Sequence, residues 1–555
     1  MQITGKRSLM IANGWVQAAG IVLIVGFLIM GILTYYTYTD EPPIPQVVQD
    51  ANGLTLFTRA DIMAGQGIFL ENGLMEYGSI FGHGAYLGPD FTTEYLHHAA
   101  LSTIRIYGET NTDTAAARTI QDFKANRYDK TTGTLTYTES QTRAFEECRA
   151  YYASFFGNPT SKFGLRPNAI RDPEQIRKLT AFFSWTAWAS AAARPGHSYS
   201  YTNNWPPEPL VGNHATADSI VWSVLSLAAL LGGTGLLLAS FGRWNLLGWH
   251  GREQQSMSFR APDEVMLTPA QRACAWFFFV MAALFLVQTL LGGASEHYRA
   301  DLQSFFGIDL GRFLPFNIVR TWHVQLSIFW VSTSYLAAGI FLAPMISGRE
   351  PRGQKALAYC LLGALVVVVV GSLAGEFAGI QGLTHSTWFG EQGFEYLDLG
   401  RVWQILLTLG LVFWVIILYR GLRGRLDSEH VGNMPWLFFF SALSIPAFYG
   451  VGLLANPGQH FTTTDFWRFW VVHLWVEDFL ELFTTILVAY IFVLLGVVHE
   501  RIALRMIYLD VILYSAGGIV GTMRSAIRNA AVSSRNVGNI AGARQPDPGY
   551  RTLSK

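Results

Sequence analysis

The chain has 555 residues, of which 51% are hydrophobic and 14% are charged, and its mean hydropathy is +0.26. This balance is too apolar for a soluble protein of this length and indicates several membrane spans. The formal net charge is zero, so the composition gives no support for nucleic-acid binding. The 3 cysteines, Cys148, Cys274 and Cys360, form no CxxC pair, which excludes a c-type haem attachment and a thiolate metal site.

Apolar runs long enough to cross a bilayer recur along most of the chain. A span needs roughly 17–25 residues, and such runs lie at 15–38, 218–242, 271–293, 318–345, 356–378, 400–420, 435–455, 467–496 and 507–523. The first run has no small-residue cleavage site, so we expect a retained anchor helix and not a signal peptide. The sequence therefore predicts a mainly α-helical, polytopic bundle of about nine spans.

Basic residues predict the orientation of this bundle. They gather around 243–272, 349–355 and 420–425, and again after the eighth span. By the positive-inside rule these loops and the N-terminus lie inside, and the segment 39–217 lies outside. That segment is polar and about as long as one ordinary domain, so we expect a globular cap, with helices near 112–127 and 140–157.

Of the 13 histidines, only His323 and His473 lie well inside an apolar run. A buried imidazole in a membrane is costly unless it has a partner, so each is a candidate functional residue. Both enter their spans about six residues from the outer end, which is roughly 9 Å deep at ~1.5 Å per residue. A histidine that only hydrogen-bonds to a neighbouring helix stays open as the alternative for either residue alone.

The segment around His473 carries a possible metal site. Glu477 and Glu481 follow His473 at i+4 and i+8, so on an α-helix all three project from one face. A nitrogen and oxygen donor pair favours iron or another borderline metal over copper(I), and the alternative is a polar stripe facing a water-filled cavity. His323 has no carboxylate one turn away, which favours a haem axial ligand. Arg320 would then pair with a haem propionate, or else anchor the helix at the interface.

Several segments resemble the nitric oxide reductase branch of the haem–copper oxidase superfamily. They are RTWHVQLSIFW, GEFAGIQG with FGEQGFEYLDLGRVWQ, and FWRFWVVHLWVEDFLELF. Copper-type oxidases would have a His-Pro-Glu-Val-Tyr-like segment where this chain has HLWVE. The outer segment resembles the cytochrome-c-like cap of the single-chain, quinol-dependent type, but it has no CxxCH. The resemblance therefore implies a cap without haem c and electrons from a membrane quinol.

The resemblance also implies roles for the buried histidines and carboxylates. His473 and Glu477 would ligate a non-haem iron, and Glu481 would feed protons to it. His323 would be one axial ligand of a low-spin haem b, and a high-spin haem b would stand beside the iron. Residues of the propionate region between the haems would be Arg320, Glu395 and Arg401, with Glu376 in the same polar cluster.

A quinol site is expected in SEHYRADLQSFFG (295–307). His297 and Asp301 would accept the two quinol protons and Phe305 would pack on the ring, all at helical spacing. The family more often has Glu where this chain has Asp301, and a capped helix end at the interface is the alternative. The quinol would be menaquinol or ubiquinol. The other expected partners are nitric oxide, membrane lipid and, in a homodimer, a second copy of the chain.

The reaction that the resemblance implies is the reductive coupling of two NO molecules, with two electrons and two protons, to N2O and water. The setting would be the cytoplasmic membrane of a bacterium or archaeon, with 39–217 on the extracytoplasmic side. Alternatives are a non-catalytic haem-b membrane protein and an oxygen-reducing or NO-dismutating relative on the same scaffold.

The sequence departs from the family pattern after GGIVGTM (517–523). The family continues with a histidine pair, whereas Arg524 and Ser525 follow here, and no later spans supply the expected HisXHis element. We therefore expect a truncated or frameshifted chain that has little or no nitric oxide reductase activity alone. The basic tail would lie outside, against the charge bias, unless the ninth run is re-entrant or fails to insert.

The expected organisation is thus an anchor helix (1–38), the cap (39–217), an incomplete catalytic-subunit-like bundle (218–523) and a polar, disordered tail (524–555).

Overall fold

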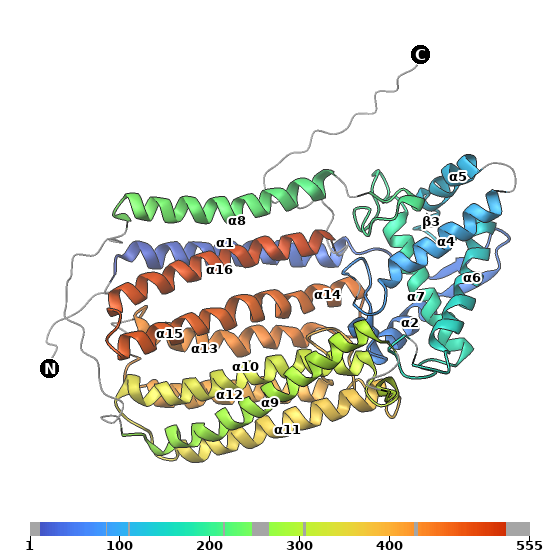
Figure 1. Cartoon of the computed structure of the whole chain (residues 1–555). Coiled ribbons are helices and arrows are strands. Elements are labelled where there is room, and N and C mark those ends of the chain that lie inside the picture. The colour runs from blue at the N-terminus through green and yellow to red at the C-terminus, as the bar shows by residue number, and fades with distance from the viewer. Residues whose placement is uncertain are drawn as a thin grey trace.

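Long, roughly parallel helices form a bundle, and a smaller cap covers one end of it (Figure 1). The structure is a computed structural model and describes residues 11–84, 86–108, 112–161, 163–214, 217–246, 266–302, 307–426 and 431–528. The predicted tail lies largely outside the described residues. A mainly α-helical, polytopic membrane protein is confirmed.

Each predicted span falls on a helix or on a run of joined helices. They are α1 (Asn13–Thr39), α8 (Ala217–Arg243), α9 (Pro269–Ala300), α10 (Phe316–Ser347), α11 (Gln354–Ile380), α12 (Arg401–Leu422), α13 (Met434–Val451) with η5 (Gly452–Leu454), α14 (Phe461–Phe469) with η6 (Trp470–Leu480) and α15 (Glu481–Leu494), and α16 (Glu500–Arg528). Among the described residues, 7 helices are long and apolar enough to cross a membrane. In α8 only Leu227–Arg243 counts as a shorter apolar helix. The eighth predicted span is divided among α14, η6 and α15.

The last helix, α16, is continuous and runs alongside α1 towards the cap (Figure 1). A re-entrant ninth run is therefore wrong. The basic turns after α10 and after α12 lie at the end of the bundle opposite the cap. This arrangement agrees with the alternation of loops that the charge pattern predicts.

The cap combines helices with one small sheet. Its strands β1 (Val47–Gln49), β2 (Thr55–Thr58), β3 (Tyr128–Asp129) and β4 (Thr134–Thr136) lie in the order β2-β1-β4-β3, with β1 and β4 parallel. Its helices are α2 (Arg59–Glu71), α3 (Leu74–Tyr77), α4 (Phe91–Tyr107), α5 (Thr112–Lys124), α6 (Glu139–Phe156) and α7 (Pro173–Ala191), and a 3-10 turn, η1 (Pro209–Val211), follows. The helices expected near 112–127 and 140–157 are confirmed as α5 and α6.

Main-chain carbonyl groups at the outer end of the bundle receive hydrogen bonds from the cap. The amide nitrogen of Gln66 in α2 donates to the carbonyl oxygens of Pro457 and Gln459, both at 2.8 Å. Asn317, at the start of α10, donates to the carbonyl oxygen of Asn72 at 2.7 Å. Hydrogen bonds donated by the cap and by the bundle therefore join the two parts.

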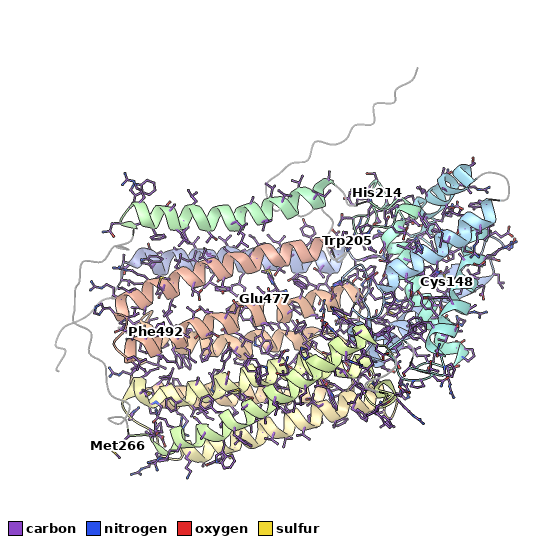
Figure 2. The ribbon with its side chains drawn as sticks, viewed as in Figure 1. Cys148, Trp205, His214, Met266, Glu477 and Phe492 are labelled. Carbon is purple, nitrogen blue, oxygen red and sulfur yellow. The ribbon has the colours of Figure 1, made fainter. Side chains whose placement is uncertain are left out.

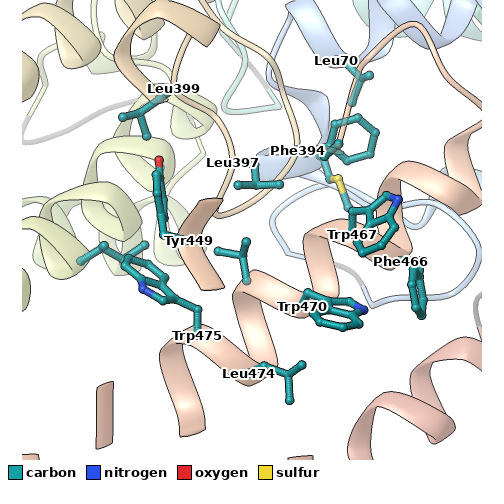
Figure 3. Close-up of a cluster of buried hydrophobic side chains, with 14 of the residues drawn as sticks. Leu70, Phe394, Leu397, Leu399, Tyr449, Phe466, Trp467, Trp470, Leu474 and Trp475 are labelled. Carbon is teal, nitrogen blue, oxygen red and sulfur yellow. The ribbon is translucent and has the colours of Figure 1, made fainter. Parts of the chain in front are cut away.

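An aromatic cluster lies directly beneath this junction (Figure 3). Leu70 of the cap borders Phe394 and Leu397, and the indoles of Trp467 and Trp470 lie below them. All of these side chains are at most 9% exposed. Burial of this much apolar surface, at roughly 25 cal/mol per Å2, holds the cap, the 391–399 loop and α14 together as one body.

Candidate functional site

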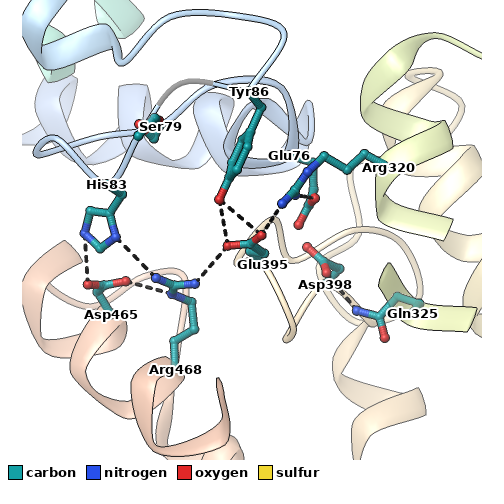
Figure 4. Close-up of polar contacts among 11 residues, drawn as sticks. Glu76, Ser79, His83, Tyr86, Arg320, Gln325, Glu395, Asp398, Asp465 and Arg468 are labelled. Atoms are coloured by element: carbon teal, nitrogen blue, oxygen red, sulfur yellow. Dashed lines mark hydrogen bonds and ion pairs between the residues drawn. The ribbon is translucent and has the colours of Figure 1, made fainter. Parts of the chain in front are cut away.

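Arg320 in α10 is the centre of a buried polar network between the cap and the bundle (Figure 4). Its guanidinium forms ion pairs with Glu76 of the cap and with Glu395 of the 391–399 loop. The guanidinium carbon also lies 3.7 Å from the centre of the Tyr86 ring, and the Tyr86 hydroxyl donates to Glu395 at 3.1 Å. An interfacial anchor role for Arg320 is therefore wrong, because two carboxylates enclose its charge. Pairing with a haem propionate stays a prediction.

Arg468 in α14 approaches Glu395 from the opposite side (Figure 4). Its Nη1 lies 3.3 Å from Glu395 Oε2, and its Nε donates to Asp465 Oδ1 at 2.7 Å. Asp465 Oδ2 in turn lies 3.4 Å from His83 Nε2 of the cap. Sequence reasoning missed Arg468, although an arginine within an apolar, tryptophan-rich run was a signal that could have revealed it.

Burial and charge affect the two glutamates of this network differently. Burial raises the pKa of Glu76 to about 7, because Arg320 offsets only part of the cost of removing the carboxylate from water. Burial also disfavours the charged form of Glu395, but Arg320 and Arg468 outweigh it and lower the pKa of Glu395. The two arginines thus favour the charged form of Glu395, whereas burial shifts Glu76 towards its neutral form.

Three further buried carboxyl groups lie next to this network. Gln325 donates to Asp398 Oδ2 at 2.7 Å, and the main-chain N–H of Gly393 donates to Glu391 Oε1 at 2.7 Å. Burial raises the pKa values of Asp398 and Glu391. Glu376 in α11 is fully buried, and neither carboxyl oxygen has a hydrogen-bond partner among the described residues. Its carboxyl interacts electrostatically with that of Asp398, which places it beside the cluster for which the sequence predicts it.

Arg401 lies beside the turn that follows α13, and its assignment to the haem propionate region stays a prediction. Its Nη1 donates to the carbonyl oxygen of Leu453 at 3.1 Å, and its Nη2 donates to that of Ala455. Both carbonyls lie at the end of η5, where the helix leaves acceptors without partners. Arg401 therefore fixes this turn and makes no ion pair with Glu395.

Glu477 lies midway along the bundle (Figure 2), in a segment where the chain forms the π-helix η6 instead of an α-helix, and His473 belongs to the same helix. His473 Nδ1 and Glu477 Oε2 are hydrogen-bonded, as their spacing of four residues predicts. Glu481 begins α15 and lines a cavity of about 560 Å3 with Thr484 and Thr485, whereas His473 lines a different cavity. The proton-feeding role of Glu481 stays a prediction.

The other edge of the His473 ring lies against α16. A Cβ atom on Gly521 would overlap His473 Nε2, and both residues line a cavity of about 420 Å3 with Gly517 and Gly233. The described residues include no group of three or more His, Cys, Asp and Glu side chains that could hold a metal. His473 and Glu477 therefore do not form a complete iron site among the described residues.

His323 in α10 faces α9. Its Nδ1 lies 2.9 Å from the carbonyl oxygen of Gln288, and its ring packs beside Gly292. This arrangement suits a haem ligand, because an imidazole that donates from Nδ1 keeps a lone pair on Nε2 for iron. The histidines His323 and His473 lie on different helices, α10 and η6, and the described contacts do not join them.

The expected quinol residues stand at the cap end of α9. The helix ends at Ala300, so Asp301 lies just beyond it and not within a helix as the expected spacing required. Asp301 is the C-cap residue, with its N–H bonded to the carbonyl oxygen of His297 at 2.9 Å. Phe305 lies outside the described residues. The structure thus places His297 and Asp301 together at a capped helix end.

Known proteins match both parts of the chain. Residues 45–207 match the family described as the NorB cytochrome c-like domain of nitric oxide reductase, and residues 272–524 match cytochrome C and quinol oxidase polypeptide I. The NorB protein of the nitric oxide reductase from Stutzerimonas stutzeri is 27% identical over 255 residues, which are 45% of this chain and 52% of the relative. The chain thus aligns with about half the length of this curated relative.

The bundle and the second match define the class, a polytopic membrane protein of the haem–copper oxidase superfamily. The cap matches the NorB cytochrome c-like domain and the curated relative is also a NorB protein, so the comparisons support a nitric oxide reductase of that superfamily.

Proposed function

We propose that this chain is a quinol-dependent nitric oxide reductase, which converts two NO molecules, two electrons and two protons to N2O and water. The observation that carries the proposal is the pair formed by His473 and Glu477 in the middle of the bundle. A carboxylate beside a histidine suits iron better than copper. The NorB-type cap at the end of the same bundle supports the proposal independently.

His323 is the proposed axial ligand of a haem b. When bound, haem supplies one-electron transfer. The chain's own contribution is to orient the imidazole so that Nε2 is the nitrogen available to iron, since Nδ1 donates to the Gln288 carbonyl. Arg320 and Arg468 contribute positive charge at the outer end of the bundle, where haem propionates would be stabilised.

His297 and Asp301 are the proposed quinol residues, with Phe305 as the ring contact. Oxidation of a quinol releases two electrons and two protons, and a histidine and a carboxylate are suitable proton acceptors. Their position at the cap end of α9 agrees with an extracytoplasmic quinol site, if the basic loops at the other end face the cytoplasm. A quinol in the membrane would make a haem in the cap unnecessary.

Glu477 and Glu481 are the proposed proton carriers for NO reduction, and His473 and Glu477 are the proposed donors to a non-haem iron. The described residues give that iron only this pair of donors. We therefore expect NO turnover by the chain alone to be slow.

The test uses the purified full chain in lipid nanodiscs, with a reduced quinol analogue as donor. We expect the bound haem to be reduced by the quinol and reoxidised by NO under anaerobic conditions, with N2O as the product. In Glu477→Gln the reoxidation should slow while quinol reduction of the haem is unchanged. Reoxidation by O2 but not by NO would favour an oxygen-reducing relative, and haem that the quinol does not reduce would contradict quinol dependence.

A further inference from the structure

Gln288 contacts both nitrogen atoms of the His323 ring. Its main-chain carbonyl oxygen lies 2.9 Å from His323 Nδ1, and its side-chain amide nitrogen lies 3.2 Å from Nδ1 and 3.2 Å from Nε2. A carbonyl oxygen only accepts hydrogen bonds, so Nδ1 carries the proton and Nε2 carries the lone pair. The side-chain amide nitrogen is equally far from both ring nitrogens, so it lies over the face of the ring and leaves the lone pair of Nε2 free.

The edge of the same ring lies where α9 has no side chain. A Cβ atom on Gly292 would lie 2.8 Å from His323 Cε1 and 3.2 Å from Nδ1, closer than side chains normally approach. The next residue, Gly293, would place a Cβ in open space, with no atom within 4 Å. Of the two neighbouring glycines, only Gly292 is required by the position of the ring.

Gln288 lies on the side of α9 that faces α10. The residues flanking Gln288, Val287 and Thr289, are exposed at the surface of the bundle, whereas Gln288 is partly buried against α10. A glutamine within an apolar span is costly unless its amide is satisfied. Here the ring of His323 provides that partner.

We propose that Gln288 and Gly292 are positioning residues for His323, and this inference rests on the proposed role of His323 as a haem ligand. Gly292 provides the space in which the ring lies. The main-chain carbonyl of Gln288 fixes the tautomer with Nε2 available. The side-chain amide of Gln288 lies over the face of the ring and helps to hold it in this orientation.

The hydrogen bond from Nδ1 to the main-chain carbonyl orients the imidazole, and loss of such an orienting partner typically weakens metal binding by about 10- to 100-fold. Gln288→Leu keeps this carbonyl, because it belongs to the main chain. A methyl group at position 292 instead pushes the ring away from the carbonyl. The two substitutions should therefore differ in their effect on haem binding.

The experiment is a titration of the full chain with haem b in detergent, followed by the Soret absorbance and by the midpoint potential of the bound haem. In Gly292→Ala we expect about 10- to 100-fold weaker haem binding and a shifted midpoint potential. Gly293→Ala is the matched control, because both substitutions give the helix the same gain in propensity. Gln288→Leu should bind haem at least as tightly as the parent chain.

The outcomes separate this inference from the proposed function. If His323→Ala abolishes haem binding but Gly292→Ala behaves like Gly293→Ala, the positioning role is wrong while the ligand assignment stands. A loss of haem binding in Gln288→Leu would also overturn the positioning role. If the parent chain binds no haem, or binds it equally well after His323→Ala, the ligand assignment falls and this inference falls with it.

Discussion

Glu76 and Arg320 form a buried ion pair that joins the cap to the membrane bundle, although 244 residues separate them in the sequence. Glu76 is fully buried, and the side chain of Arg320 is only 16% exposed. The same guanidinium also pairs with Glu395. Arg320 thus neutralises carboxylates from two separate segments. Its loss would leave Glu76 without this counter-charge and Glu395 with Arg468 alone.

Replacing Arg320 by methionine should strongly destabilise the junction between cap and bundle. Removal of one partner from a buried ion pair typically costs about 3–5 kcal/mol, because the remaining charge has no compensation. We expect a lower thermal transition in detergent and faster proteolysis at the cap. Arg312→Met, at an exposed arginine, is the control. Equal stability of the two variants would mean that the network contributes nothing at this junction.

Stability of the cap should fall as pH rises, because of Glu94 in α4. Tyr151 donates to Glu94 Oε1 at 2.8 Å, and burial raises the pKa of Glu94 to about 7. Since the folded pKa exceeds the unfolded value of 4.5, the stabilisation is complete below about pH 4.5. It is lost as pH rises through about 7, and the loss is on the order of 3 kcal/mol at ~1.4 kcal/mol per pKa unit.

The measurement is hydrogen exchange of the peptides of α4 and α6 between pH 5 and pH 8, after correction for intrinsic exchange. Glu94→Gln should remove the pH-dependent part of the protection. Glu147→Gln, at an exposed glutamate of α6, should retain it. The same pH dependence in both variants would assign the effect to another group.

The membrane bundle could be predicted from the sequence because a bilayer imposes a length and a composition on every span. The helices of the cap were harder to predict from the sequence. In α7 every residue from Leu179 to Ala191 is buried, so the helix has no polar face and no period that reveals it. The helix η6 was expected as an α-helix, since periodicity does not distinguish a π-helical turn within an apolar run.

In the candidate site, contacts within one helix were predictable from the sequence, whereas contacts between distant segments were not. The bond between His473 and Glu477 was predictable because both residues lie on one helix, four positions apart. The contacts of Arg468 with His83 and Glu395 were not, because they join three segments that are distant in the sequence. The roles of Gly292 and Gln288 could not be predicted from the sequence for a similar reason. Their importance depends on the close approach of α10 and not on α9 alone.

Substituting Gly65 in the cap should test how tightly α2 and α7 pack. A Cβ on Gly65 would overlap the main-chain carbonyl of Lys178 and lie 2.9 Å from Phe182 Cβ. Gly65→Ala should therefore destabilise the cap by about 1–3 kcal/mol through overpacking. Gly67→Ala, two positions along α2 with no atom within 4 Å, should instead stabilise it by roughly 0.5–1 kcal/mol. Thermal unfolding should show a lower transition temperature for Gly65→Ala and a higher one for Gly67→Ala. Shifts of the same sign in both variants would contradict the close packing of α2 against α7 at Gly65.

A final pair of glycines tests whether α16 sets the position of His473. A Cβ on Gly521 would overlap the His473 ring, whereas a Cβ on Gly517 meets nothing within 4 Å, and both residues border the same cavity. Gly521→Ala should displace the ring and break its hydrogen bond to Glu477. We expect NO-driven reoxidation of the haem to slow in Gly521→Ala while quinol reduction of the haem stays unchanged. Gly517→Ala should leave both rates at the level of the parent chain, since it adds a methyl group to the cavity without touching the histidine. If Gly521→Ala also leaves both rates unchanged, the ring can shift without consequence, and the contact between α16 and His473 has no part in the reaction.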